Sequence, residues 1–247
     1  MSLEFVMNPQ SIHAVVTGGT RGIGFAVARA LLAANGHVLI TGRDEARVRR
    51  AAAELGDAAS ARDRVVGAVA DIRDPRAIER ALQRAAEAFG TVDTLINNAG
   101  VGIFRPVDEL TDDDWQQVID TNLTGVFYAT RAAIPLMKRA GGGWIINIAS
   151  LAGRNYFASA SAYCASKAGL VAFTEAVMLE VRDHNIRVSC IMPGSVATEF
   201  NGRPPRPDET WKLAPDDVAE VVMDLLRHPA RSLPSKIEIR PAKTGST

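Results

Sequence analysis

The sequence is poor in cysteine, lacks any long hydrophobic run and carries no excess charge of either sign. Its 247 residues include two cysteines, Cys164 and Cys190, too few for a disulfide framework, which predicts a reducing compartment such as the cytoplasm. No apolar run approaches the roughly 20 residues that span a bilayer, and 28 basic residues balance 28 acidic ones. We therefore expect neither a membrane nor nucleic acid as the main partner.

Clustered metal ligands and a secretory signal are also missing. The four histidines lie apart from acids and cysteines, without the spacing of a metal site: His13, His37, His184 and His228. Residues 1–10 have no basic region followed by an apolar core. We expect them to form a short disordered lead.

Short apolar runs alternate along the chain with segments of helical periodicity. We predict strands at 12–19, 37–43, 64–72, 93–100, 143–150, 186–194 and 235–241. We predict helices at 24–36, 44–56, 74–90, 111–139, 159–184 and 214–228. This alternation indicates an α/β protein, doubly wound, with a mostly parallel seven-stranded sheet and helices on both faces. The length and the 47% of hydrophobic residues suit one domain over 1–247, with 197–214 as a loop over a ligand crevice.

A glycine-rich turn, TGGTRGIG at residues 17–24, joins the first strand to the first helix. Gly18, Gly22 and Gly24 leave room for a pyrophosphate beside the backbone, and the helix that follows presents N–H donors. A tight structural turn would use glycine too. The strand before and the helix after favour a dinucleotide site.

The charges near this turn indicate which dinucleotide. Sites for NAD usually carry an acid at the end of the second strand, and here Gly42 stands at that place. Arg43 follows it and Arg21 lies within the turn, and two guanidinium groups suit a 2′-phosphate. Asp44 could replace the missing acid, but we assign it to helix capping. We therefore predict NADP(H) rather than NAD(H).

Tyr163 and Lys167 in YCASK are four residues apart within a predicted helix, so both side chains lie on one face. An ammonium beside a phenol would stabilise the phenolate. Alternatively, the helix is merely amphipathic, with a surface lysine and a half-buried tyrosine.

Taken together, the chain resembles the short-chain dehydrogenase/reductase family over roughly residues 11–240. The resemblance is carried by TGGTRGIG, ADI, NNAG, TNLTG, INIAS, YCASK and PGSVAT, in this order on the expected elements. It implies a Rossmann-type sheet and four catalytic residues, Asn122, Ser150, Tyr163 and Lys167. It also implies, partly with the arginines above, these cofactor contacts: Gly18, Thr20, Arg21, Gly22, Ile23, Gly24, Arg43, Asp71, Ile72, Asn98, Ala99, Gly100, Tyr163, Lys167, Pro193, Gly194, Val196 and Thr198.

The resemblance assigns a role to each catalytic residue. Tyr163 would be the acid or base at a carbonyl or hydroxyl oxygen, its pKa lowered from about 10 by Lys167 and a cationic nicotinamide. Ser150 would hold the substrate oxygen, although a serine often simply closes a strand. Asn122 would mark a local helix break whose carbonyl holds a water in a relay to Lys167; otherwise it is a solvent-facing asparagine.

The substrate is the least determined feature of the site. Residues after the fourth, fifth and sixth strands are expected to line its pocket: Phe104, Leu151, Arg154, Tyr156, Phe157, Met192, Phe200 and Trp211. This lining is apolar, with Arg154 as an anion anchor. It suits a mid-sized ketone, a β-keto ester or a β-ketoacyl thioester, as in a 3-oxoacyl carrier-protein reductase or a general carbonyl reductase.

Other functions stay open at this point. An NAD(H)-dependent alcohol dehydrogenase would use the same residues. A lyase or epimerase with the same Tyr–Lys pair usually has a longer chain, and a non-enzymatic NADP(H)-binding regulator tends to lose the Tyr or the Lys.

Assembly is predicted from the long helices 112–140 and 160–183, which are apolar on more than one face. The apolar residues are Val118, Phe127, Leu136, Leu170, Phe173 and Val177. In the family these helices pair across a two-fold axis, which implies a dimer or a homotetramer. The C-terminal IEIRPAKTGST departs from the glycine-rich strand that completes many tetramers, so either state is open.

Overall fold

The computed structural model describes residues 12–202, 206 and 208–243. The predicted lead at 1–10 and a part of the predicted loop 197–214 lie outside the described residues. No helix among the described residues is long and apolar enough to cross a membrane.

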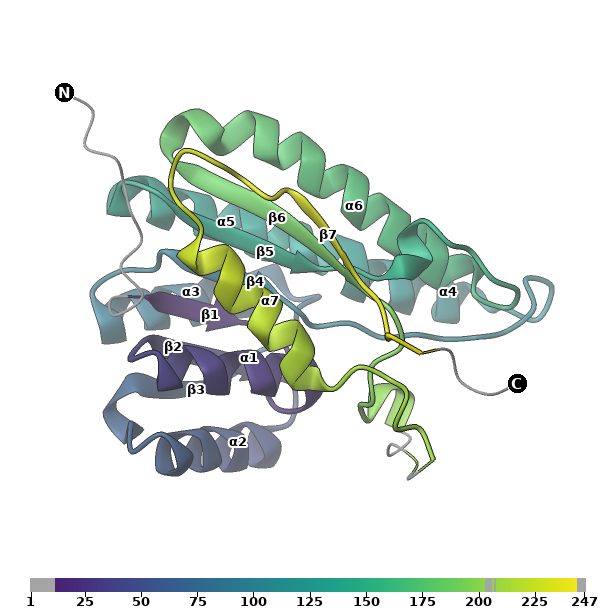
Figure 1. The fold of residues 1–247 in the computed structure, drawn as a ribbon, viewed down its shortest axis with the longest axis horizontal. Helices are drawn as coiled ribbons and strands as arrows, with labels where there is room; N and C mark the ends of the chain where they lie inside the picture. Colours follow the sequence, from purple (N-terminus) through teal and green to yellow (C-terminus); the bar gives the residue numbers. More distant parts are fainter. Residues whose placement is uncertain (1–11, 203–205, 207, 244–247) are drawn as a thin grey trace.

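A single sheet of seven parallel strands forms the centre of the described chain (Figure 1). Its strands are β1 (His13–Val16), β2 (His37–Gly42), β3 (Val65–Val69), β4 (Thr94–Asn97), β5 (Gly143–Ile148), β6 (Ile186–Pro193) and β7 (Lys236–Ile239). Their order is β3-β2-β1-β4-β5-β6-β7, and every neighbouring pair is parallel. The order reverses between β1 and β4, which is where such sheets open a ligand crevice.

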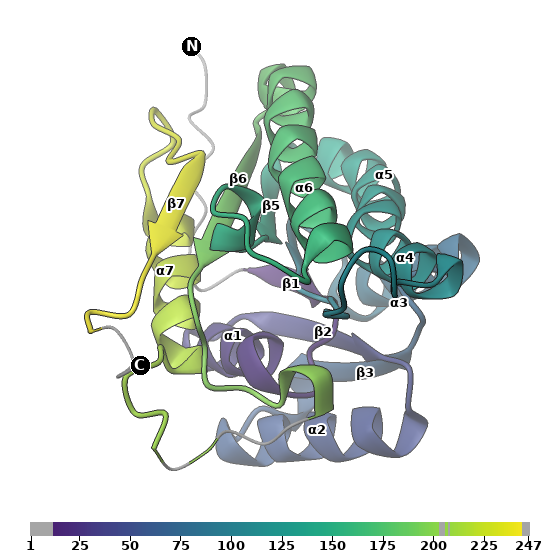
Figure 2. The ribbon, with the colours of Figure 1, turned by 90° about the vertical axis from the view of Figure 1, so that its right-hand side faces the viewer.

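Helices cover both faces of the sheet, as predicted. They are α1 (Gly22–Ala33), α2 (Glu45–Ala58), α3 (Pro75–Phe89), α4 (Asp112–Ile119), α5 (Gly125–Ala140), α6 (Ser161–Val181) and α7 (Pro215–Arg227). One apolar cluster joins α1, α2 and α7 to the sheet, and a second joins α3, α5 and α6 to it. Figure 2 shows the sheet between these two groups of helices.

Local signals fix where several helices begin. The Asp44 carboxylate accepts a hydrogen bond from the Arg47 N–H at 2.8 Å, which confirms the predicted cap of α2. Thr111 and Asp114 form the predicted capping box of α4. Because β1, β2 and β4 are parallel, the ends of β2 and β4 lie at the same edge of the sheet as the glycine turn.

The predicted helix 111–139 is divided in the structure. Five residues between α4 and α5, Asp120–Thr124, form a π-helix. Such insertions are uncommon and are frequent at functional sites. Asn122 lies at the centre of this insertion, so the predicted local break is present.

Candidate active site

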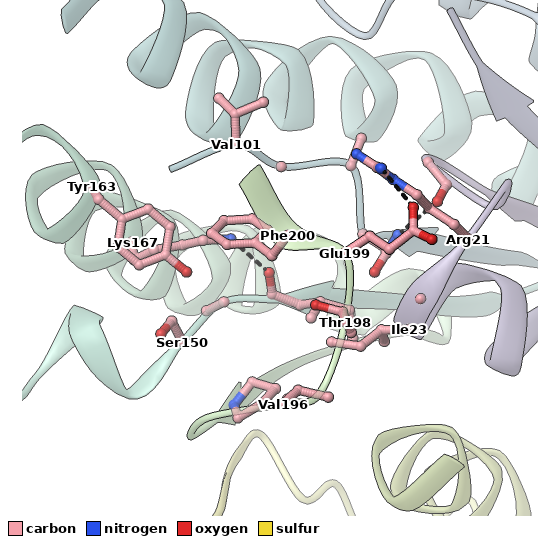
Figure 3. Close-up of a pocket in the computed structure, with 18 of the residues that line it drawn as sticks. Arg21, Ile23, Val101, Ser150, Tyr163, Lys167, Val196, Thr198, Glu199 and Phe200 are labelled. Carbon is pink, nitrogen blue, oxygen red and sulfur yellow. Dashed lines mark hydrogen bonds and ion pairs between the residues drawn. The ribbon is translucent and has the colours of Figure 1, made fainter. Parts of the chain in front are cut away.

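A cavity of about 1750 Å³ runs along the carboxyl ends of the strands. Residues from the glycine turn, the ends of β2 to β6 and the loop after β6 line it (Figure 3). Sites for one drug-sized ligand usually measure about 300–1,000 Å³. This cavity therefore has room for a dinucleotide and a second small molecule.

The glycine turn is held close to the segment after β4. Gly18 has a φ of +65°, and a Cβ atom there would lie 2.9 Å from Ala99 Cα. The Asn98 amide donates to the carbonyl oxygens of Thr17 and Gly18 at 3.0 and 3.1 Å. A Cβ on Gly24 would collide with the Asn98 side chain, so glycine serves the packing of two loops as well as the approach of a ligand.

Helix α1 points its N-terminus at this cavity through Gly22 and Ile23. Among the described residues no side chain caps it, whereas Asp44 caps α2 and Asp74 caps α3. N–H groups at an uncapped helix start suit an anion, and the helix dipole adds to the attraction. The turn therefore fits the phosphates of a dinucleotide.

Four arginines surround the far end of the cavity: Arg21, Arg43, Arg47 and Arg73. Asp71 lies among them and accepts hydrogen bonds from the backbone N–H and the guanidinium group of Arg73, the shortest at 2.6 Å. The Arg73 guanidinium holds the pKa of the Asp71 carboxyl below its usual range. Arg73 was not singled out in the sequence, because no motif marks an arginine two residues after Asp71.

Position 42 has no room for the acid of an NAD site. A Cβ on Gly42 would lie 2.7 Å from Thr20 Cγ2 and 3.0 Å from Val48 Cγ2. Both are short, branched side chains that cannot swing away. The glycine at this position therefore follows from the packing of β2 against the glycine turn and α2.

Arg21 is paired with an acid that sequence reasoning missed. Its Nη1 lies 3.1 Å from Glu199 Oε2, and both side chains line the cavity (Figure 3). Glu199 belongs to the segment after β6, 178 residues away in the chain. The spacing of residues along the chain could not reveal this pair, because only folding brings Glu199 to Arg21 at the cavity.

Tyr163 and Lys167 lie one turn apart on α6, and both face the cavity. The Lys167 side chain is buried, with its Nζ 5.9 Å from the centroid of the Tyr163 ring. Nζ donates to the Ile148 carbonyl oxygen at 2.9 Å. Burial lowers the pKa of Lys167 to about 8. These contacts exclude the alternative of a solvent-facing lysine.

Ser150 stands at the end of β5 beside Tyr163. Burial raises the pKa of the Tyr163 phenol, and a hydrogen bond with Ser150 partly offsets the effect. Desolvation disfavours the phenolate, and the Ser150 hydroxyl compensates only in part. The predicted lowering of the phenol pKa relied on a cationic nicotinamide as well as on Lys167, and it stays a prediction.

Asn122 is buried and does not line the cavity. Its amide accepts from the Val101 N–H and donates to the Val101 carbonyl, both at 2.8 Å. It also donates to Ser166 Oγ at 3.0 Å, and that hydroxyl donates to the Tyr163 carbonyl at 2.8 Å. Asn122 is thus not solvent-facing: it ties the segment after β4 to the helix that carries Tyr163. Ser166 was missed because Asn122, the partner that gives it this role, is 44 residues away in sequence.

The predicted cofactor contacts, with one exception, lie together. Gly24 alone does not line the cavity. The others do: Gly18, Thr20, Arg21, Gly22, Ile23, Arg43, Asp71, Ile72, Asn98, Ala99, Gly100, Tyr163, Lys167, Pro193, Gly194, Val196 and Thr198. Among the described residues there is no group of three histidine, cysteine or acidic side chains that could hold a metal ion.

The predicted substrate pocket is brought together only in part. Five of its residues line the cavity: Phe104, Leu151, Phe157, Phe200 and Trp211. Three lie elsewhere. Arg154 forms an ion pair with Glu238 at 2.7 Å, Tyr156 is 69% exposed to solvent, and Met192 is buried in a small apolar cluster. The prediction of Arg154 as the anion anchor of the pocket is therefore wrong: its side chain lies outside the cavity and pairs with Glu238, which also pairs with Arg240.

Comparison with known proteins identifies similar chains. A family model described as short chain dehydrogenase matches residues 12–208. Sulfoacetaldehyde reductase 2 of Chromohalobacter salexigens is 34% identical over 240 residues, which cover 93% of this chain and 94% of that protein.

Two solved structures extend this similarity. An alcohol dehydrogenase of the archaeon Thermococcus sibiricus, complexed with 5-hydroxy-NADP, has a TM-score of 0.87 and 29% identity and covers 94% of this chain and 97% of that one. A 3-ketoacyl-(acyl-carrier-protein) reductase of Brucella melitensis, complexed with NADH, has a TM-score of 0.83 and 27% identity and covers 93% of this chain and 96% of that one.

Proposed function

Because this chain belongs to the short-chain dehydrogenase family of oxidoreductases, we propose that it is an NADP(H)-dependent enzyme that interconverts a carbonyl compound and a secondary alcohol. The observation that carries the proposal is the meeting of Tyr163, Ser150 and the buried Lys167 on the wall of a dinucleotide-sized cavity. When bound, the nicotinamide supplies or accepts the hydride.

Tyr163 handles the proton of the reaction. In reduction its hydroxyl donates a proton to the carbonyl oxygen, and in oxidation the phenolate accepts the proton of the alcohol. Its raised pKa keeps the phenol protonated at neutral pH, which suits the reductive direction. Ser150 donates a hydrogen bond to the same substrate oxygen as negative charge develops there.

Lys167 supports the phenol by its charge. A pKa of about 8 leaves the ammonium largely protonated at pH 7. A positive charge on the same helix face stabilises the phenolate that forms when the proton leaves. The Asn122 side chain is fully engaged by Val101 and Ser166, so its part in a proton relay falls to its backbone carbonyl.

Two observations support NADP(H) over NAD(H). Arg21, Arg43, Arg47 and Arg73 line one end of the cavity, and guanidinium groups bind a phosphate through charge-assisted hydrogen bonds. The packing around Gly42 leaves no room for a ribose-binding acid. A 2′-phosphate is thus favoured where an NAD site would place a carboxylate.

The proposal is tested by following NADPH oxidation against a panel of ketones, β-keto esters and acyl thioesters, with NADH in parallel. We expect turnover with at least one class and at least tenfold tighter binding of NADPH. Tyr163→Phe should bind NADPH normally and lose 10²-fold or more of turnover. A folded Tyr163→Phe protein that reduces its substrate at the parent rate would refute the proposed chemistry.

A further inference from the structure

Three phenylalanines surround the catalytic phenol, and each comes from a different loop. We name Phe104, Phe157 and Phe200, which follow β4, β5 and β6, the aromatic collar. The Phe104 and Phe200 rings meet the Tyr163 ring edge-on, with centroids 5.5 and 6.0 Å away. Phe157 packs on Phe104 at 5.9 Å. Figure 3 shows Phe200 beside Tyr163 at the cavity.

The collar rings are incompletely covered by the protein. Phe104, Phe157 and Phe200 are 43%, 52% and 38% exposed, although all three line the cavity. Grouped apolar surface that stays uncovered beside a reactive group marks a place where a ligand binds. Loop packing alone would be expected to bury these rings more completely.

Gly102 permits the two rings nearest Tyr163 to converge. A Cβ atom there would lie 2.8 Å from both Phe104 Cζ and Phe200 Cε1. A side chain at this buried position would force the two rings to shift. The collar is therefore a feature that the local sequence accommodates and not a chance contact of two mobile rings.

We propose that the aromatic collar is a subsite for a flat aromatic substituent attached to the carbonyl carbon, so that aryl ketones are the preferred substrate class. This inference rests on the proposed function. A carbonyl oxygen held at Tyr163 and Ser150 places its substituent among the collar rings. Aromatic rings attract one another edge-to-face or offset-stacked at centroid distances of about 4.5–7 Å, which is the spacing already present between collar and phenol. A saturated substituent gains only contact area.

The test compares acetophenone with cyclohexyl methyl ketone, which share a carbon skeleton and differ in the ring. The measured quantity is the kcat/KM of acetophenone divided by that of cyclohexyl methyl ketone, both with NADPH. When this ratio is compared between protein variants, the difference in intrinsic reactivity between the two ketones cancels. Phe104→Leu and Phe157→Leu keep apolar volume and remove the ring. An aromatic pair contributes about 0.5–1.5 kcal/mol, which converts to a roughly 2- to 12-fold fall in the ratio for each variant.

Tyr156→Leu is the matched control. Tyr156 precedes Phe157 and is 69% exposed, but it does not line the cavity. Its loss should leave the ratio unchanged. Thermal unfolding of all three variants checks that the loops keep their structure.

The outcomes separate the inference from the function on which it rests. If no carbonyl compound is reduced with NADPH, the proposed function fails. If carbonyls are reduced but the ratio is the same in parent and collar variants, the collar proposal is overturned and the function stands. If the parent reduces other carbonyls and neither of these ketones, the collar proposal is also overturned, because aryl ketones are then not the preferred substrates.

Discussion

The buried position of Lys167 disfavours the charged form of its amino group. The pKa of the amine falls from its ordinary 10.5 to about 8 in the folded protein, which corresponds to roughly 3 kcal/mol at about 1.36 kcal/mol per pKa unit. One hydrogen bond, to the Ile148 carbonyl, offsets a part of this cost. The presence of a lysine at this buried position is therefore explained by its role beside Tyr163 and not by a contribution to stability.

Replacing Lys167 with methionine should stabilise the fold while abolishing turnover. We expect the free energy of unfolding at pH 7 to rise by roughly 1–3 kcal/mol, because no charge has to be buried. The cost in the parent is complete below pH 8 and fades as the pH rises toward 10.5, where the unfolded chain also loses this proton. Urea unfolding at pH 7 and pH 10 measures both effects. A variant less stable than the parent by the same amount at both pH values would contradict the argument.

Glu199 competes with a ligand phosphate for Arg21. Both side chains are about half exposed, so the pair itself contributes little to stability. Removing the carboxylate in Glu199→Gln frees the guanidinium and takes a negative charge from the phosphate end of the cavity. We expect NADPH to bind about two- to fivefold more tightly in low salt, with NADH little changed and the gain reduced by added salt.

Fluorescence titration of both cofactors checks this prediction. Glu209→Gln is the matched control, since Glu209 also lines the cavity but pairs with Lys212 and Arg206, neither of which is a predicted phosphate ligand. Equal gains for NADPH and NADH in the Glu199 variant would show that Arg21 does not meet the 2′-phosphate.

Between α4 and α5 a π-helix forms the local break expected at Asn122, and it brings Asn122 to Val101 and Ser166. Widening the helix by one residue lets a side chain in its wall reach sideways to the loop after β4. Through Ser166 the same contact reaches the backbone of Tyr163. One irregular turn thus links three of the elements that form the cavity.

Asn122→Ala should cost both stability and activity. The substitution leaves the backbone N–H and the backbone carbonyl of Val101 without their amide partner. At the usual penalty for buried unpaired groups, this lowers the free energy of unfolding by roughly 2–4 kcal/mol. Ser166→Ala removes one hydroxyl of the same chain and should cost about half as much. Denaturant unfolding and kcat, measured on both variants, check the order. Equal stability of Asn122→Ala and parent would show that these hydrogen bonds are replaced by water.

The elements themselves could be predicted from the sequence because their signals are local. Apolar runs, several of them followed by glycine, predicted the strands. The Asp44 cap and the Thr111–Asp114 capping box predicted the starts of α2 and α4. A local break was expected at Asn122, but its form as a π-helix was not predicted, because the sequence DTNLT does not distinguish a π-helix from another irregular turn. The residues that the sequence missed at the site, Glu199 and Ser166, act through contacts that exist only after the chain has folded. Arg154 was misplaced because its partner, Glu238, is 84 residues away.

Charge is distributed unevenly over the whole molecule. The chain has no net charge, yet among the residues that the structure describes nine cationic and four anionic side chains line the cavity. The balancing acids lie outside the crevice. Such an arrangement attracts a polyanionic dinucleotide without making the surface as a whole basic.

Most of the apolar residues from which the sequence predicted an interface with a second copy are buried inside this chain. Val118, Leu136, Leu170 and Val177 are buried by the protein's own helices and sheet. Phe127 is different, at 39% exposed. Two further apolar residues on the same helices, Trp115 on α4 and Leu179 on α6, are 42% and 58% exposed. The surface that could meet a second copy is therefore narrower than predicted.

We propose a dimer or a tetramer whose contact includes this surface. Light scattering should give a multiple of the 26.4 kDa chain at micromolar concentration. Phe127→Glu should shift the mass toward 26.4 kDa, because a symmetric contact places two such charges in one interface. Val69→Glu, which adds the same charge at a 53% exposed residue of the edge strand β3, should leave the mass unchanged. A parent that scatters as a single chain would refute the proposed assembly, and equal dissociation by both variants would place the contact elsewhere on the molecule.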